Sequence, residues 1–273
     1  MTILRILCLT LALFSSAQAQ SPVLPGPGLP VAGGGGGYTA QGVHFSSTGP
    51  QGLDRGGSLT GVSNTFVGAI SFWFKATAND ANTFYIFTSN RVIVSRQTSG
   101  RIQLVIGDGV VGNVVNVQTS STVYTAANGN WHHYMASWNG NAAGAVDVKV
   151  YTDGVSDLGT NSSSFTGNAF DYTAGNWFVS NPGLPIDADL ADVWFDTGIA
   201  YPTQLDLSVL SNRQKFINSG APVNLGTTGS TPSGTAPPVF FSGSVASWNT
   251  NKATGGGFTL NSGPLTAAAT NPP

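Results

Sequence analysis

Three aspartates near residue 190 have a spacing that could support carboxylate chemistry: Asp187, Asp189 and Asp192. Two carboxyl groups on either side of a glycosidic bond can act as nucleophile and general acid/base, and retention of configuration needs them about 5–5.5 Å apart. Asp187 and Asp189 alternate on a predicted strand and so project from one face, where their oxygens suit calcium. In a third interpretation, these carboxylates are solvated or cap turns.

Aromatic residues in a loop-like segment form a second candidate site. Tyr172 and Trp177 flank the sequence Thr-Ala-Gly-Asn. Such rings can stack on sugar faces while their polar atoms make hydrogen bonds. We therefore expect both rings to be exposed, with Asp171 and Asn176 supplying hydrogen bonds. Four other tryptophans lie in strand patterns and are predicted to be core: Trp73, Trp131, Trp138 and Trp194.

The pair His132-His133 looks like a metal-binding pair. Neighbours on a strand point to opposite faces, so the two imidazoles cannot chelate one ion together. We expect one ring to fill the core and the other to face the concave surface of the sheet.

Short β-branched and aromatic runs, separated by turns rich in Gly, Asn and Asp, must position these residues. Val92 and Val94 alternate with Ile93 and Ser95, which predicts strands with one buried face and one wet face. The expected strands cover residues 69–75, 83–88, 91–96, 101–106, 113–118, 131–139, 145–152, 176–180, 189–196, 238–242 and 257–260. One short helix is expected within 207–218, capped by Asp206 or Ser208. The fold class is therefore all-β, an antiparallel β-sandwich with one short helix.

Charged residues make up only 8% of the chain, and all twelve acidic residues are Asp. The formal net charge is −2. A weakly charged surface rich in Gly, Ser, Thr and Asn offers no basic field for nucleic acid, which excludes that class of partner.

The N-terminus has the pattern of a secretory signal peptide over residues 1–19: a cationic start, a short apolar run and the small residues of 17–19. The apolar run is too short to span a bilayer, so we expect no membrane span after cleavage. Cleavage would also remove Cys8, the single cysteine. A Pro/Gly-rich linker follows over 20–37, and the domain is expected over 38–273. The predicted localisation is secreted, either extracellular or periplasmic.

Four motifs resemble the concanavalin A-like lectin/glucanase superfamily, in particular its laminin-G-like and pentraxin-like branch. The motifs are Ile-Ser-Phe-Trp-Phe-Lys at 70–75, Asn-Trp-His-His-Tyr at 130–134, Val-Tyr-Thr-Asp-Gly at 150–154 and Asp-Leu-Ala-Asp-Val-Trp-Phe at 189–195. The resemblance covers about 43–218 and implies a jelly roll, with a concave face and rim loops that often bind sugars and sometimes calcium. Residues 220–273 resemble C-terminal stretches of lectin-like proteins from bacteria and their phages, and their two apolar runs are expected to complete the sandwich.

The same resemblance sharpens the interpretation of the three aspartates. They reproduce the glucanase pattern Glu-x-Asp-x-x-Glu, but Asp stands at both outer positions. Each outer carboxyl is thus one methylene shorter, and a misplacement of ~1 Å can cost about a hundredfold in rate. We therefore predict that the protein is not an enzyme.

The sequence predicts a secreted, non-catalytic, lectin-like domain whose partner is a glycan or surface polysaccharide. No cofactor is certain; calcium is the candidate. Two alternatives stay open: a structural or adhesive component of a cell surface or virion without a sugar site, and a glycoside hydrolase of the glucanase type. The sequence indicates neither the glycan nor the oligomeric state.

Overall fold

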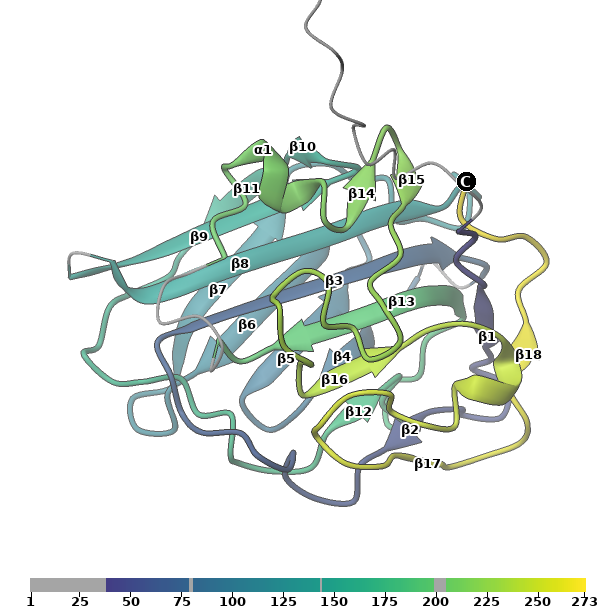
Figure 1. Cartoon of the computed structure of the whole chain (residues 1–273), viewed down its shortest axis with the longest axis horizontal. Helices are drawn as coiled ribbons and strands as arrows, with labels where there is room; N and C mark the ends of the chain where they lie inside the picture. Colours follow the sequence, from purple (N-terminus) through teal and green to yellow (C-terminus); the bar gives the residue numbers. More distant parts are fainter. Residues whose placement is uncertain (1–37, 79–80, 143, 199–204) are drawn as a thin grey trace, which may run out of the picture. The chain divides into compact units, whose positions relative to one another are not determined.

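The computed structural model describes residues 38–78, 81–142, 144–198 and 205–273. Within these residues the chain forms two eight-stranded antiparallel sheets, packed face to face as a β-sandwich (Figure 1). The predicted signal peptide and linker lie outside the described residues and stay predictions. No helix of the described part is long and apolar enough to cross a membrane.

Sheet A has the strand order β10-β9-β8-β3-β13-β1-β18, and β16 also pairs with β13. Its strands are β1 (Val43–Phe45), β3 (Val67–Ala76), β8 (His132–Ala142), β9 (Ala145–Thr152), β10 (Val155–Ser156), β13 (Ala188–Asp196), β16 (Val239–Phe241) and β18 (Thr266–Ala267).

Sheet B has the order β11-β7-β6-β5-β4-β12-β2-β17. Its strands are β2 (Leu53–Asp54), β4 (Phe84–Thr88), β5 (Val92–Arg96), β6 (Ile102–Gly107), β7 (Asn113–Thr119), β11 (Leu158–Asn161), β12 (Phe178–Val179) and β17 (Thr259–Leu260). The remaining elements are the hairpin β14 (Ile217–Asn218) and β15 (Ala221–Pro222), the helix α1 (Leu210–Arg213) and the 3-10 helix η1 (Val245–Ser247).

The main apolar core lies between the two sheets, where the inward residues of each strand meet. Phe195 lies at the centre of an aromatic cluster: its ring centroid lies 4.9 Å from that of Phe87 and 5.2 Å from that of Trp177. Such tilted aromatic pairs contribute packing beyond the apolar area they bury. This core accounts for the period-two pattern of the strands.

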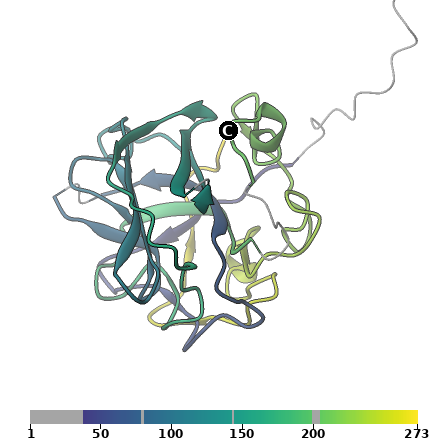
Figure 2. The same cartoon turned by 90° about the vertical axis from the view of Figure 1, so that its left-hand side faces the viewer.

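A second apolar cluster covers the outer face of sheet A. Trp73 and Trp194 project from that face and meet Phe216 and Leu207 of the segment that follows β13, together with Phe240 of β16. The Trp194 Nε1–H donates to the Gly229 carbonyl at 2.8 Å. Figure 2 shows this C-terminal segment on one side of sheet A and sheet B on the other. The centre of sheet A is therefore buried on both faces, and every residue of β13 is buried.

The prediction of an all-β antiparallel sandwich with one short helix is confirmed, and the C-terminal apolar runs do complete both sheets. The predicted helix cap is wrong. Val209 precedes α1 without a side-chain cap, and Asp206 Oδ1 instead accepts from the Ser208 N–H at 2.8 Å. Three of the four tryptophans predicted as core are buried, while Trp131 is only partly buried.

The second apolar cluster makes a testable contribution to stability. Trp194 is 0% exposed and stacks edge-on with Phe216. We expect Trp194→Ala to lower the free energy of unfolding by about 3–5 kcal/mol, the usual cost of truncating a buried aromatic side chain. Urea unfolding measures the loss, and Val155→Ala, at a 70% exposed position, is the control. A loss no larger than that of the control would show that the segment does not pack on sheet A.

Candidate functional site

The outer face of sheet B is the sheet surface that neither apolar cluster of the described residues covers. Because side chains alternate along a strand, the residues between the core positions of β4 to β7 point away from the core between the sheets. These outward residues are Tyr85, Thr88, Ile93, Ser95, Gln103, Val105, Asn116 and Gln118. We call this set the outer face. Three of them, Thr88, Ser95 and Val105, are nonetheless buried, with 4%, 2% and 9% of their surface exposed.

The strand register arranges the outer face in two rows. Tyr85, Ser95, Gln103 and Gln118 pair in succession and form a row with hydroxyl and amide groups. The second row is more apolar and consists of Thr88, Ile93, Val105 and Asn116, extended across β12 by Phe178. Neighbouring strands lie about 4.8 Å apart, so four strands span about 15 Å.

The two rows themselves contain no Asp, Lys or Arg. Charged residues border them: Arg91 and Arg101 stand two residues before Ile93 and Gln103 on the same side of the sheet, and Asp54 pairs with Phe178. The amide groups are already ordered: Gln103 Nε2 donates to Asn116 Oδ1 at 2.9 Å, and Gln97 Nε2 donates to Ser95 Oγ at 2.8 Å. A side-chain amide has two N–H donors and an oxygen with two lone pairs, so each retains capacity for a ligand. The face can therefore exchange hydrogen bonds with neutral polar groups while its apolar row contacts carbon.

The prediction that Tyr172 and Trp177 are exposed is wrong. Both side chains are 0% exposed and belong to the core between the sheets. The Tyr172 hydroxyl donates to the Val67 carbonyl at 3.0 Å and accepts from Trp138 Nε1–H at 2.7 Å. The polar loop around these residues resembled a surface segment, but the aromatic side chains turn inward because the core needs large apolar groups.

Asp171 and Asn176 are loop-capping residues in this structure. Asp171 Oδ1 accepts from the backbone N–H groups of Thr173 and Ala174. Asn176 Oδ1 accepts from the Gly57 N–H at 2.7 Å, and its Nδ2 donates to Asp54 at 2.6 Å. With Tyr172 and Trp177 buried, no exposed ring of this segment stands beside them, and their ligand-binding role stays a prediction.

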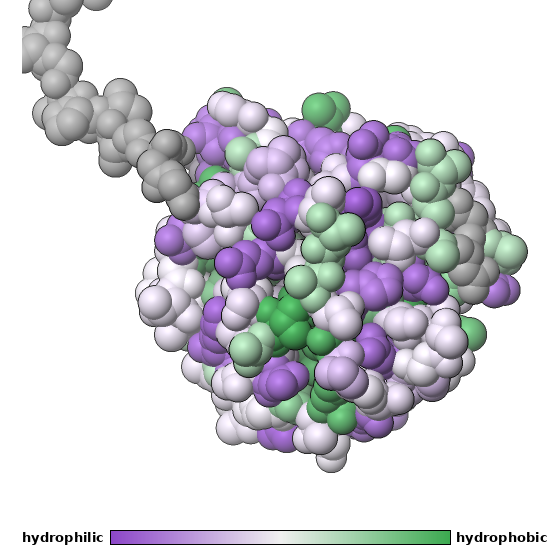
Figure 3. All heavy atoms as spheres, turned by 90° about the vertical axis from the view of Figure 1, so that its right-hand side faces the viewer, coloured by the Kyte–Doolittle hydropathy of each residue, from purple (hydrophilic) through white to green (hydrophobic). Residues whose placement is uncertain are grey.

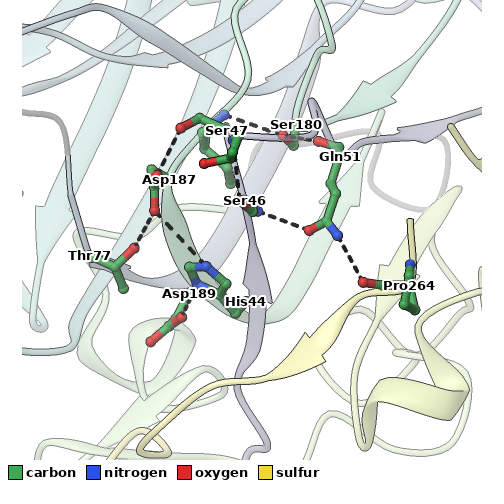
Figure 4. Close-up of polar contacts among 11 residues, drawn as sticks. His44, Ser46, Ser47, Gln51, Thr77, Ser180, Asp187, Asp189 and Pro264 are labelled. Carbon is green, nitrogen blue, oxygen red and sulfur yellow. Dashed lines mark hydrogen bonds and ion pairs between the residues drawn. The ribbon is translucent and has the colours of Figure 1, made fainter. Parts of the chain in front are cut away.

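Asp187 and Asp189 lie on one side of sheet A near the start of β13, as predicted, and both approach His44 (Figure 4). His44 Nδ1 lies 2.8 Å from Asp189 Oδ1, and its Nε2 lies 4.0 Å from Asp187 Oδ1. Asp187 also accepts from the hydroxyls of Ser47 and Thr77, at 2.8 and 2.9 Å. The carboxylates therefore already have protein partners.

The described residues contain no group of three or more His, Cys, Asp or Glu side chains that could hold a metal ion. Asp189 is 2% exposed, and burial raises its pKa although the hydrogen bond from His44 opposes the shift. The predicted calcium site at Asp187 and Asp189 would have to displace the Ser47, Thr77 and His44 contacts. This arrangement favours a structural role for both aspartates.

Asp192 occupies a β-bulge in β13 with a positive φ of 48°. The bulge lies where pairing with β1 ends, at Leu190, and pairing with β16 begins, at Val193. The carboxylate is 3% exposed, and the Tyr38 hydroxyl lies 2.8 and 2.9 Å from its two oxygens. Burial raises the pKa of Asp192 to about 7, while the Tyr38 hydrogen bond and Lys252 oppose the shift.

His132 and His133 do point to opposite sides of β8, which confirms that they cannot chelate one ion together. His133 is 1% exposed under the C-terminal segment and hydrogen-bonds Ser71 Oγ through Nε2 at 2.8 Å. His132 faces the other way, toward Tyr124, and its Nδ1 lies 2.7 Å from Asp153. The two rings thus lie on different sides of the sheet, as expected, but the side that His133 faces is covered by the C-terminal segment.

No family model and no curated protein matches the chain. Among solved structures, it is similar to a candidate carbohydrate-binding protein from Bacteroides ovatus, with a TM-score of 0.52 and 9% identity over 86% of this chain and 62% of that chain. Matches with lower TM-scores include domains LG4-5 of the mouse laminin alpha1 chain (0.44, 12% identity, 63% of this chain and 45% of that one). They also include the binding domain of botulinum neurotoxin DC in complex with rat synaptotagmin II (0.40, 11% identity, 68% and 49%).

The chain spans less than two thirds of the length of each of these chains. At such identities the likeness concerns the fold alone. Together with the two antiparallel sheets, it shows that this domain has the concanavalin A-like lectin/glucanase fold predicted from the sequence.

The buried carboxyl of Asp192 predicts an unusual pH dependence of stability. Its folded pKa of about 7 exceeds the unfolded value of about 3.9, so the fold is stabilised below about pH 4 and loses that stability as the pH rises to about 7. Asp192→Asn keeps a residue that tolerates positive φ and removes the charge. Each unit of difference between the folded and unfolded pKa corresponds to about 1.4 kcal/mol. As the pH rises from 4 to 8, the free energy of unfolding of the variant should therefore come to exceed that of the parent by a few kcal/mol.

Urea unfolding across this pH range measures the difference between parent and variant. Asp147→Asn is the control, because Asp147 forms an ion pair with Lys149 at the surface and its loss should give no such gain. If the free energy of unfolding varies with pH in the same way for the parent and for Asp192→Asn, ionisation of Asp192 does not destabilise the fold, which contradicts the prediction.

Proposed function

We propose that this domain is an exported, non-catalytic glycan-binding module and that it binds a neutral oligosaccharide along the outer face of sheet B. The observation that carries the proposal is the pair of rows on that face, one of hydroxyl and amide groups and one that mixes apolar and polar side chains, without a charged side chain in either. The fold supports it only in general terms, because this fold is shared by binding domains of many kinds.

The chemistry of a neutral glycan complements both rows. Sugar hydroxyls donate and accept, and the amides of Gln103, Asn116 and Gln118 can do the same. Tyr85 and Phe178 are partly exposed aromatic residues at the β4 and β12 side of the face, where a ring can contact the apolar side of a pyranose. Rows about 15 Å long suit a short segment of an extended glycan chain rather than a single sugar in a deep pocket.

The positions of the acidic residues support binding without hydrolysis. Asp189 and Asp192 are 2% and 3% exposed, and both belong to sheet A, whereas the proposed glycan lies on sheet B. Asp187 accepts hydrogen bonds from two hydroxyls. A general acid must reach the leaving-group oxygen directly or through one water molecule, and buried carboxylates on another sheet do not provide that reach. Asp54, the carboxylate beside Phe178 on sheet B, already accepts from the Gly56 N–H and from Asn176 Nδ2.

A glycan array followed by affinity measurement tests the proposal. We expect binding to one or more neutral polysaccharides, and the double variant Tyr85→Ala with Gln103→Ala should weaken it by at least about tenfold, which corresponds to about 1.4 kcal/mol. Gln214→Ala, an exposed glutamine next to α1, is the matched control and should leave affinity unchanged. Absence of binding to any glycan, or full affinity in the double variant, would refute the proposal.

The same assay with a chelator gives a separate prediction. Because Asp187 and Asp189 already interact with His44, Ser47 and Thr77, we expect affinity to be the same with EDTA and with added calcium. A calcium requirement that disappears in Asp187→Asn would instead assign these aspartates to a metal site.

A further inference from the structure

Two hairpin turns lie side by side and line a depression of about 220 Å³, which we call the hairpin depression. The hairpin of β9 and β10 closes through Asp153 and Gly154, and the hairpin of β14 and β15 closes through Ser219 and Gly220. All four residues have a positive φ, between 52° and 81°, as in the type I′ turn that suits two-residue hairpins. A Cβ atom at Gly154 would lie 3.6 Å from Ile217 Cγ2, so the two hairpins are in direct contact.

Arg213 brings a cation to the hairpin depression from α1, which lies next to both hairpins (Figure 1). Its Cζ lies 4.6 Å from the centroid of the Tyr151 ring, and its Nη1 donates to the carbonyls of Leu207 and Ser208. A planar guanidinium that is stacked on an aromatic ring and hydrogen-bonded at one end has little freedom to move. The protein therefore positions this cation before any ligand arrives.

The Arg213 guanidinium has unused hydrogen-bonding capacity. It forms no ion pair with a carboxylate of the described residues, and within the same part of the chain its Nε is buried without a hydrogen-bond partner. The two hydrogen bonds that it does make both come from Nη1. Because a guanidinium has five N–H donors and is always charged, the N–H groups of Nη2 stay available to an anion.

Neutral polar side chains surround this cation. Gln214, Asn218 and Ser219 line the same depression, and none of these three side chains has a hydrogen-bond partner among the residues that the structure describes. Their amide and hydroxyl groups can both donate and accept. Leu210, which is 58% exposed, adds an apolar side chain. The hairpin depression thus offers one positive charge, several neutral hydrogen-bonding groups and one apolar contact.

Asp153 also lines the hairpin depression, but its carboxylate already has partners in the protein. Its Oδ1 accepts from the His133 N–H at 2.7 Å, and its Oδ2 lies 2.7 Å from His132 Nδ1. The negative charge of Asp153 limits the kind of anion that fits. One guanidinium beside one carboxylate suits a ligand with a single negative charge better than a phosphate monoester, which carries nearly two. A carboxylate is therefore the anion that the depression favours.

A larger open depression of the domain has no such selectivity. It measures about 500 Å³ and is lined by uncharged residues only: Ser47, Asn82, Thr83, Phe84, Leu184 and Pro185. The end of the sandwich where β13 begins shows an apolar area near its middle, bordered by hydrophilic residues (Figure 3). Nothing in this lining singles out one class of ligand.

We propose that the hairpin depression binds a uronic acid, a monosaccharide with a carboxylate, and that Arg213 is the partner of that carboxylate. Gln214, Asn218 and Ser219 exchange hydrogen bonds with the ring hydroxyls, and Leu210 contacts an apolar part of the ring. The two hairpins lie at the β10 edge of sheet A, away from the outer face of sheet B. The inference therefore goes beyond the binding of a neutral glycan and does not rest on it.

Titration of the isotope-labelled protein with sodium D-glucuronate, followed by amide NMR shifts, tests this site. We expect saturable shifts of the Gly154, Ser219 and Gly220 amides in the millimolar range of glucuronate, at constant ionic strength. Glucose has a similar ring without the carboxylate, and sodium acetate has the carboxylate without the ring. Each should bind at least about tenfold more weakly than glucuronate, because each lacks one half of the contacts.

A matched pair of variants changes the charge of the depression without altering Arg213. Asp and Asn both tolerate the positive φ of Ser219 and have nearly the same shape. Ser219→Asp adds a negative charge to the lining and should weaken glucuronate binding by at least about tenfold, whereas Ser219→Asn should bind like the parent. Circular dichroism confirms that both variants are folded.

The double variant Tyr85→Ala with Gln103→Ala separates this site from the outer face, because it should bind glucuronate with the affinity of the parent. Loss of glucuronate binding in that variant would overturn the inference. So would the absence of saturable shifts, glucose or acetate that binds as tightly as glucuronate, or equal glucuronate affinities of Ser219→Asp and Ser219→Asn.

Discussion

The packing of sheet A on both faces is the constraint on which the rest of this structure depends. Trp73 and Trp194 project away from the central core and are covered by Phe216 and Phe240 from the C-terminal part of the chain. Burial of such large aromatic side chains supplies much of the free energy that holds the covering segment in place. As a result, the centre of sheet A is covered, and the outer face of sheet B is the sheet surface that stays open at its centre.

The bulge at Asp192 follows from the pairing of β13 with strands that belong to this covered layer. On one edge, β13 must pair first with β1 and then with β16, and the extra residue between these two ladders takes a positive φ. Asp tolerates this conformation better than most residues. The bulge also places a carboxylate in the covered layer, where the Tyr38 hydroxyl is its hydrogen-bond donor. The aspartate pattern that resembles a catalytic motif thus has a structural use here.

The scarcity of charge gives the outer face of sheet B its chemical character. With only 8% charged residues, the chain presents amides and hydroxyls where many sheets present Lys or Asp. Removing an uncharged polar group from water costs less free energy than removing an ion, and such groups match ligands that are themselves polar and neutral. The apolar row beside them adds contact area without requiring a deep pocket. These features together are what an extended, shallow binding mode, as proposed above, requires.

Local patterns in the sequence determined the longer strands, their inward and outward residues and the sandwich class, because side-chain alternation and turn residues are properties of short segments. Ile93 and Ser95 of the outer face could be identified as outward from that alternation alone. The rows in which they lie could not, because register depends on pairing between strands distant in sequence. The same limit applies to Tyr172 and Trp177. Their polar neighbours in the sequence suggested a surface loop, but both rings pack against Phe195 in the core between the sheets. Which face of which sheet stays open was decided only when the C-terminal segment packed on sheet A, since burial depends on long-range contacts that no local pattern encodes.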